Sequence, residues 1–131
     1  MLFRSYTNQL LVSHHPDPTK SRGQYLDLLK LSVTEDPRCP RNAFYYAREL
    51  SFHGHWEEAI KECKRYLDLP DATWGNERCY AYRVMGKCYD ELFDYKNAEL
   101  HYMKAASEAP NTREPWCELA MLMYRHCRWA E

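Results

Sequence analysis

The chain has 131 residues, the length of a single domain that can bury a hydrophobic core. Lysine and arginine number 18 and aspartate and glutamate 19, and this balance argues against a nucleic-acid-binding protein, which normally carries an excess of basic residues. No run of 18 apolar residues occurs, so the sequence predicts no membrane span.

The first 19 residues differ in composition from the rest of the chain. Residues 10–12, Leu-Leu-Val, predict a short strand and are too few for the apolar core of a secretion signal. Pro16 and Pro18 indicate a turn or linker after it. We therefore expect residues 1–19 to be a linker, or the end of a preceding domain, with one short strand.

From residue 20 onward, apolar residues recur at intervals of three and four, which is the pattern of amphipathic helices. Together with the prolines between them, these stripes predict six helices, at residues 20–36, 41–53, 56–68, 76–92, 95–109 and 113–127. Short links such as Gly54-His55 require neighbouring helices to run antiparallel. The candidates for N-terminal caps are Asn42, Asp94 and Thr112.

The helical region contains an internal repeat. The segment at residues 54–59 recurs in similar form at 93–98, thirty-nine residues later, and again at 127–131 after a further thirty-four. Thirty-four residues is the period of the tetratricopeptide repeat, and the longer first interval indicates an insertion at residues 72–75. The residues that match the packing pattern of this repeat are Ala47, Ala59, Tyr82, Gly86, Tyr89, Ala98, Tyr102, Pro110, Trp116 and Ala120.

The repeat predicts an all-α fold, an antiparallel helix-hairpin solenoid that resembles a tetratricopeptide superhelix. We expect the repeat domain to span residues 20–131, with a cap helix at 20–39, repeat 1 at 40–75, repeat 2 at 76–112 and a partial repeat 3 at 113–131. Small residues let the two helices of a hairpin approach closely, and each hairpin needs its neighbour to bury its remaining apolar surface.

The third repeat is incomplete, because the sequence stops just before the alanine expected in its second helix. We therefore expect the chain to be a fragment of a longer protein. The face that carries Leu119, Leu122, Met123 and Cys127 would then lack a partner, and bare apolar surfaces drive association. This predicts a homo-oligomer formed through the unpaired last helix.

The cysteines and histidines show no metal-binding pattern. No CxxC pair occurs among the six cysteines, so we interpret them as small core residues in a reducing, cytoplasmic compartment; they are Cys39, Cys63, Cys79, Cys88, Cys117 and Cys127. His53 and His55 flank a glycine at a hairpin turn, where we interpret them as solvated residues. The sequence predicts no metal and no cofactor for this chain.

A further resemblance covers nearly the whole chain. Its motifs lie at residues 14–26, 36–37, 41–45, 69–74, 109–110 and 113–116. These segments resemble the junction between a bacterial family 2 glycosyltransferase domain and its C-terminal tetratricopeptide repeats. The resemblance implies a parent protein in which an Asp-x-Asp motif binds a divalent metal and a nucleotide sugar, and in which a late histidine can complete the metal site.

No Asp-x-Asp motif occurs in this chain, so the catalytic domain implied by the resemblance is missing. By the same resemblance, His14 or His15 would be the late histidine of an intact parent, and the alternative is that both are linker residues. We therefore predict that the chain alone is not an enzyme. A contribution to sugar transfer, through a histidine or an acceptor surface, stays open as an alternative.

Solenoids of this kind bind partners on a concave surface lined by the first helix of each hairpin. The residues that we predict to contact a protein or peptide are Arg48, Phe52, Tyr80, Arg83, Lys87 and Met121. The three cations among them suit a carboxylate or phosphate, and the alternative is a solvated face with ordinary ion pairs. The prediction is a protein-interaction or scaffold module from a glycosyltransferase, or alternatively a free-standing adaptor for an acidic peptide or C-terminal tail.

Overall fold

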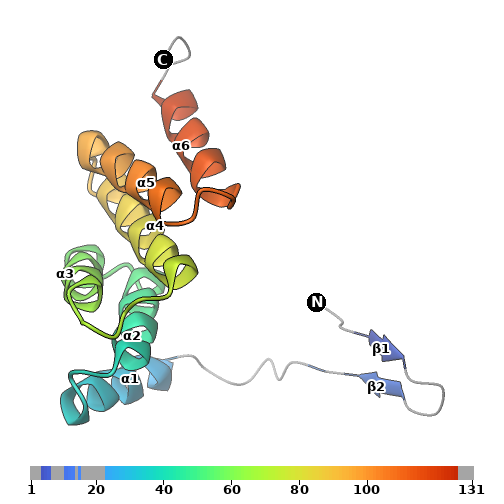
Figure 1. Cartoon of the computed structure of the whole chain (residues 1–131). Helices are drawn as coiled ribbons and strands as arrows, with labels where there is room; N and C mark the ends of the chain where they lie inside the picture. Colours follow the sequence, from blue (N-terminus) through green and yellow to red (C-terminus); the bar gives the residue numbers. More distant parts are fainter. Residues whose placement is uncertain (1–3, 7–10, 14, 16–22, 127–131) are drawn as a thin grey trace.

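The computed structural model describes residues 4–6, 11–13, 15 and 23–126. Two short strands, β1 (Arg4–Tyr6) and β2 (Leu11–Ser13), pair antiparallel with Ser5 opposite Val12. The sequence predicted one strand here, and the structure has a hairpin instead. Figure 1 shows this hairpin apart from the helices, and no described strand residue contacts a helix.

Six helices make up residues 23–126 apart from their connections: α1 (Gly23–Glu35), α2 (Pro40–Phe52), α3 (Trp56–Leu67), α4 (Gly75–Glu91), α5 (Tyr95–Glu108) and α6 (Glu114–Arg125). Each begins and ends within about three residues of its predicted bounds. For residues 23–126, the predicted all-α antiparallel helix-hairpin solenoid is confirmed.

The helices pack in chain order, α2 with α3, α4 with α5, and each hairpin on the next. Figure 1 shows them rising as one stack from α1 to α6, with the second helices α3 and α5 to the left and α2 and α6 to the right. The first helices also contact one another, α2 with α4 and α4 with α6. Helix α1 packs on α2, as expected for a cap helix, and buries Leu29.

One of the three predicted helix caps is confirmed. The side chain of Asp94 accepts a hydrogen bond from the backbone N–H of Asn97 at 3.2 Å and caps α5. Asn42 and Thr112 were wrong, because α2 begins at Pro40 and α6 has Arg113 as its cap residue. Both helices have a proline in their first turn, which supplies the helical φ without needing a side-chain cap.

Helices α4 and α5 approach each other closely at Gly86. A Cβ atom at this position would be 2.8 Å from Cε1 of the buried Tyr102 ring, so only glycine allows the two helices this separation. Ala47, Ala59 and Ala98 are also buried at helix contacts. These small residues therefore take the packing role that the repeat predicted for them.

Helix α6 packs differently from the prediction. Leu119 and Leu122, expected on a bare face, are buried in a cluster with Ala98 and Tyr102 of α5. The apolar face exposed on α6 is instead the one that carries Trp116, Ala120, Met121 and Tyr124. Trp116 and Ala120 are exposed because no described helix covers this face. Pro110, which follows the end of α5, is exposed as well, and Cys127 lies outside the described residues.

Candidate functional site

The predicted partner-binding residues lie on the three first helices, α2, α4 and α6. We define the groove as the facing surfaces of α2 and α4, which are lined by Phe44, Arg48, Phe52, Tyr80 and Lys87. It consists of two pockets that meet at Tyr80, one of about 110 Å³ and one of about 230 Å³. Met121, the remaining predicted residue, is exposed on α6 and lines neither pocket.

Arg48 and Lys87 occupy the same position in successive repeats. Arg48 follows the small residue Ala47, and Lys87 follows its counterpart Gly86. The small residue faces the partner helix of its own hairpin. The residue that follows it therefore points in the same direction, relative to that contact, in both hairpins. The solenoid therefore places two positive charges on the same side of consecutive first helices.

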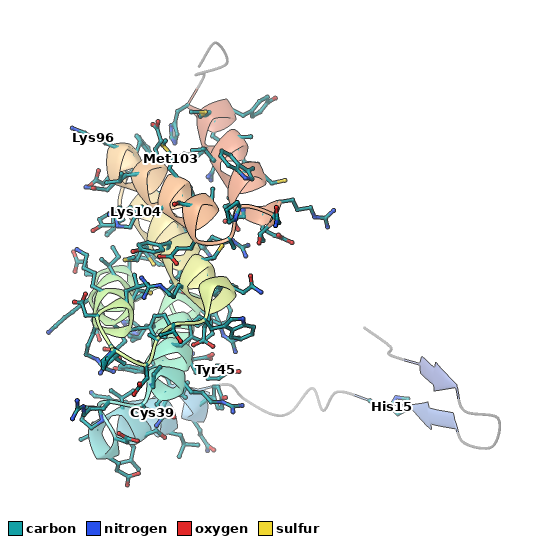
Figure 2. The ribbon with its side chains drawn as sticks, viewed as in Figure 1. His15, Cys39, Tyr45, Lys96, Met103 and Lys104 are labelled. Carbon is teal, nitrogen blue, oxygen red and sulfur yellow. The ribbon has the colours of Figure 1, made fainter. Side chains whose placement is uncertain are left out.

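The guanidinium of Arg48 lies against aromatic rings, and no carboxylate among residues 23–126 forms an ion pair with it. Its Cζ atom lies 4.8 Å from the centroid of the Tyr45 ring and 5.8 Å from that of Phe52. Figure 2 shows Tyr45 on the side of α2 away from α3. Nε of Arg48 is buried, and it has no hydrogen-bond partner among the described residues. The rings therefore orient the cation.

Lys87 is the second cation of the groove. Its side chain is exposed, with Nζ 5.9 Å from the centroid of the Trp56 ring. Within residues 23–126, no ion pair joins it to a carboxylate. An ammonium group in this position provides a mobile point charge, which complements the fixed fork of Arg48.

Arg83, the third predicted cation, is already neutralised. Its Nε donates to Oε2 of Glu118 at 2.8 Å and its Nη2 donates to Oε1 at 2.5 Å, in a two-pronged contact between α4 and α6. The hydrogen bonds that Arg83 donates to Glu118 raise the pKa of Arg83 above its ordinary value. A second pair, Asp90 with Arg125, joins the same two helices. We call these two pairs the charged seam, and they show that Arg83 is not available in the way the sequence predicted.

The larger pocket of the groove contains an aromatic residue that sequence reasoning missed. Its lining residues come from α2 and from the start of α4: Phe44, Tyr45, Arg48, Trp74, Asn76, Glu77 and Tyr80. The rings of Phe44 and Tyr80 meet edge to face, 5.5 Å apart. Trp74 lies in the insertion that lengthens the first repeat interval, and that insertion was the available signal for it.

No protein-family model matches the sequence, and no curated protein matches it. Among solved structures, the chain is similar to one described as the crystal structure of MamA, at 14% sequence identity and a TM-score of 0.37, over 88% of each chain. The assignment of the solenoid therefore rests on the helices and contacts described above.

The cysteines support the structural interpretation. The five described cysteines are free thiols, and Cys63, Cys79 and Cys88 are buried. Burial raises the pKa of the Cys63 thiol well above its usual value and the pKa of the Cys88 thiol to about 12, so both are held as neutral thiols. The location in a reducing compartment stays a prediction.

The described histidines form no metal site. His53 and His55 stack at the turn between α2 and α3. Nε2 of His53 lies 3.5 Å from Oε1 of Glu49, and Nδ1 of His55 lies 3.8 Å from Oε1 of Glu58. Within the described ranges, no three histidine, cysteine, aspartate or glutamate side chains gather as metal ligands would. His15 is exposed, and His14 lies outside the described residues. None of the helices described is long and apolar enough to cross a membrane.

Proposed function

We propose that this chain is a protein-interaction module that binds an acidic peptide segment in the groove between α2 and α4. The single observation that carries the proposal is the pair of cations at the equivalent repeat positions 48 and 87, neither of which has a carboxylate partner among the described residues. By contrast, Arg65, Arg78 and Arg125 all have one. A peptide carboxylate would supply what is missing in the groove.

The energetics favour a peptide over a small anion. A hydrogen bond to a charged group contributes about 1.5–3 kcal/mol, so two such contacts are enough for only weak binding of a free carboxylate. The exposed Phe52 and the half-buried Tyr80 add apolar surface in the pocket that Lys87 lines. A peptide with acidic side chains can use the cations and the apolar surface together, whereas a small anion can use the cations alone.

The experiment is a calorimetric titration with a short peptide that contains three consecutive glutamates, and with the matching glutamine peptide. We expect the glutamate peptide to bind and the glutamine peptide not to bind. The double variant Arg48→Glu, Lys87→Glu should weaken binding by about 30-fold or more, because attraction is replaced by repulsion. Arg48→Gln and Lys87→Gln should each weaken it by about fivefold.

Arg113→Glu is the matched control, because the Arg113 side chain is 89% exposed and lies outside the groove. It should bind the peptide as the original chain does. Thermal unfolding should give similar midpoints for all these variants. Equal binding of the glutamine peptide, or an equal loss of affinity in Arg113→Glu, would contradict the proposal.

We also propose that the module belongs to the C-terminal part of a bacterial, cytoplasmic glycosyltransferase, and this rests on the sequence resemblance alone. The nucleotide sugar, the divalent metal and a ligand role of His14 or His15 would then be properties of the parent protein. Sequencing the gene upstream of Met1 tests this. An Asp-x-Asp motif in a nucleotide-binding domain supports the origin, and its absence there leaves the free-standing adaptor. That this chain alone is not an enzyme stays a prediction.

A second copy of the chain is the partner that we propose for the exposed face of α6. Trp116, Ala120 and Tyr124 follow one another at intervals of four, so they form one stripe along the helix, and Met121 lies beside it. Exposed apolar stripes favour association. Light scattering should give a dimer for the original chain and a monomer for Trp116→Ser with Tyr124→Ser. A clean monomer at high concentration of the original chain would contradict this.

A further inference from the structure

The connection between α3 and α4 presents an exposed tryptophan from a fixed loop. Trp74 occupies the N-cap position of α4 and is 64% exposed. The loop that carries it is bound to the rest of the fold, because Nη1 of Arg78 donates to the carbonyl oxygens of Leu67 and Ala72 at 3.1 and 3.0 Å. Arg78 is itself held by Glu108, with Nε 3.1 Å from Oε2.

This arrangement distinguishes Trp74 from an exposed residue on a loose loop. Ala72 is buried, and its N–H donates to the carbonyl of Leu69 at 3.1 Å. A partner that covers Trp74 would therefore not have to order the loop first, which lowers the entropic cost of binding. Nothing in the packing of the helices requires a tryptophan here, because most of its ring faces solvent.

Trp74 lines the larger pocket of the groove together with rings from both helices. The ring of Phe44 lies close to three tyrosine rings, with centroid distances of 5.6 Å to Tyr45, 5.6 Å to Tyr66 and 5.5 Å to Tyr80. Sites for drug-sized ligands usually occupy about 300–1,000 Å³, and this pocket of about 230 Å³ is smaller. Its size suits one large side chain of a peptide.

The chemistry of the lining selects an aromatic side chain. Rings prefer to meet other rings edge to face or offset, and tryptophan, tyrosine and arginine are the residues most enriched in binding hot spots. Arg48 also lines this pocket, so a carboxylate close to the aromatic residue can reach the guanidinium.

The length of the groove limits the spacing of the peptide motif. Along α2, Phe44 stands at the larger pocket and Phe52 at the smaller one, eight residues further on. At a rise of about 1.5 Å per residue, this corresponds to about 12 Å. An extended peptide covers about 3.3 Å per residue and spans that distance with about four residues.

We propose that the Trp74 pocket anchors an aromatic side chain of the bound peptide, and that the acidic residues of the peptide lie within about four residues of that anchor. The inference deepens the proposed function and depends on it. The aromatic side chain enters between Trp74 and Phe44, and the carboxylates that accompany it pair with Arg48 and Lys87.

The test is a fluorescence-anisotropy titration with a labelled peptide that contains one phenylalanine followed by three glutamates, and with the same peptide in which alanine replaces the phenylalanine. We expect the phenylalanine peptide to bind about tenfold more tightly than the alanine peptide. Trp74→Ala should remove this advantage and leave the affinity for the alanine peptide unchanged. A leucine peptide that binds as tightly as the phenylalanine peptide would overturn the preference for an aromatic anchor.

Trp116→Ala is the matched control, because Trp116 is also an exposed tryptophan, 54% exposed, but lies on α6 outside the pocket. It should keep the tenfold advantage. An equal effect of Trp74→Ala and Trp116→Ala would overturn the inference. If the alanine peptide binds through Arg48 and Lys87 and Trp74→Ala changes nothing, the inference fails while the proposed function stands. If neither peptide binds, both fail.

Discussion

The groove and the charged seam contain similar residues, but their arginines have different partners. Both lie between consecutive first helices of the solenoid, and both contain arginines. In the charged seam, Arg83 is satisfied by Glu118 and Arg125 by Asp90, so the charges join α4 to α6. In the groove, Arg48 faces aromatic rings, and the described residues supply it with no carboxylate. A cation on a first helix therefore either joins that helix to the next one or can bind a partner. Which of the two occurs depends on whether the next helix places a carboxylate beside it.

The largest expected loss of stability is at Gly86. This residue lies on α4, which forms one wall of both the groove and the charged seam. Gly86→Ala would place Cβ within 3.0 Å of three atoms of the Tyr102 ring. Overpacking of this kind costs about 1–3 kcal/mol, although the same change in an exposed helix usually stabilises by about 0.5–1 kcal/mol. We expect chemical denaturation to give a clear loss of stability.

The double-mutant cycle provides the control for this prediction. In a Tyr102→Leu background the ring is gone, so Gly86→Ala should cost much less or become stabilising. A Gly86→Ala variant that is more stable than the original chain would mean that α4 and α5 are further apart than the structure places them.

A smaller effect should follow from opening the charged seam. Glu118→Gln leaves Arg83 without its carboxylate, and we expect a loss of about 1 kcal/mol in the free energy of unfolding, because the pair is only partly exposed. The released guanidinium lies on the smaller pocket of the groove, so the affinity for the glutamate peptide should rise by about threefold. Calorimetry measures both quantities.

Glu114→Gln is the matched change on the same helix. Among the described residues, the ion pair of Glu114 is with the exposed Arg113, at 3.8 Å. The substitution should therefore affect neither stability nor binding. If the two glutamine variants behave alike, the distinction between the groove and the charged seam is wrong.

The smallest effect concerns His101 of α5, which packs against Tyr82 and Tyr89 of α4, the helix common to the groove and the charged seam. Burial lowers the pKa of His101 below its ordinary value of about 6.5, while its Nδ1–H donates to the carbonyl of Asn97 at 2.7 Å. The unfolded chain therefore binds a proton at a higher pH than the folded chain does. Stability should fall as pH decreases below about 6.5.

Denaturation at about pH 7.5 and about pH 5.5 measures this slope. His101→Phe should reduce it, and His55→Phe, at an exposed turn, should not. The lysines that face His101, Lys64 and Lys104, add to the effect by repelling its charged form. An unchanged slope in His101→Phe would assign the pH dependence to other groups.

The fold could be predicted well from the sequence, because the repeat depends on the spacing of residues that are close together in the chain. The three- and four-residue apolar intervals set the helices, and the small residues at 47, 59, 86 and 98 mark where they touch. The prediction for α6 was wrong, because which side of a helix turns to its neighbour depends on its rotation in the stack. That rotation buries Leu119 and exposes Trp116.

The candidate site was predicted only in part, because ion pairing depends on distant residues. Arg83 resembles Arg48 in sequence, and only the structure brings Glu118, thirty-five residues away, within reach of it. Trp74 was missed for a similar reason. Its place in the groove is fixed by the contacts that Arg78 makes with the loop. These contacts cannot be predicted from the periodic pattern of apolar residues.

The most direct test of the account is an NMR titration that follows the Nε–Hε signals of the arginines as the peptide of one phenylalanine and three glutamates is added. Arg48 should shift progressively to saturation, because its guanidinium gains a carboxylate partner, while Arg83 keeps its contact with Glu118 and stays in place. A titration in which Arg83 shifts and Arg48 does not would contradict the account.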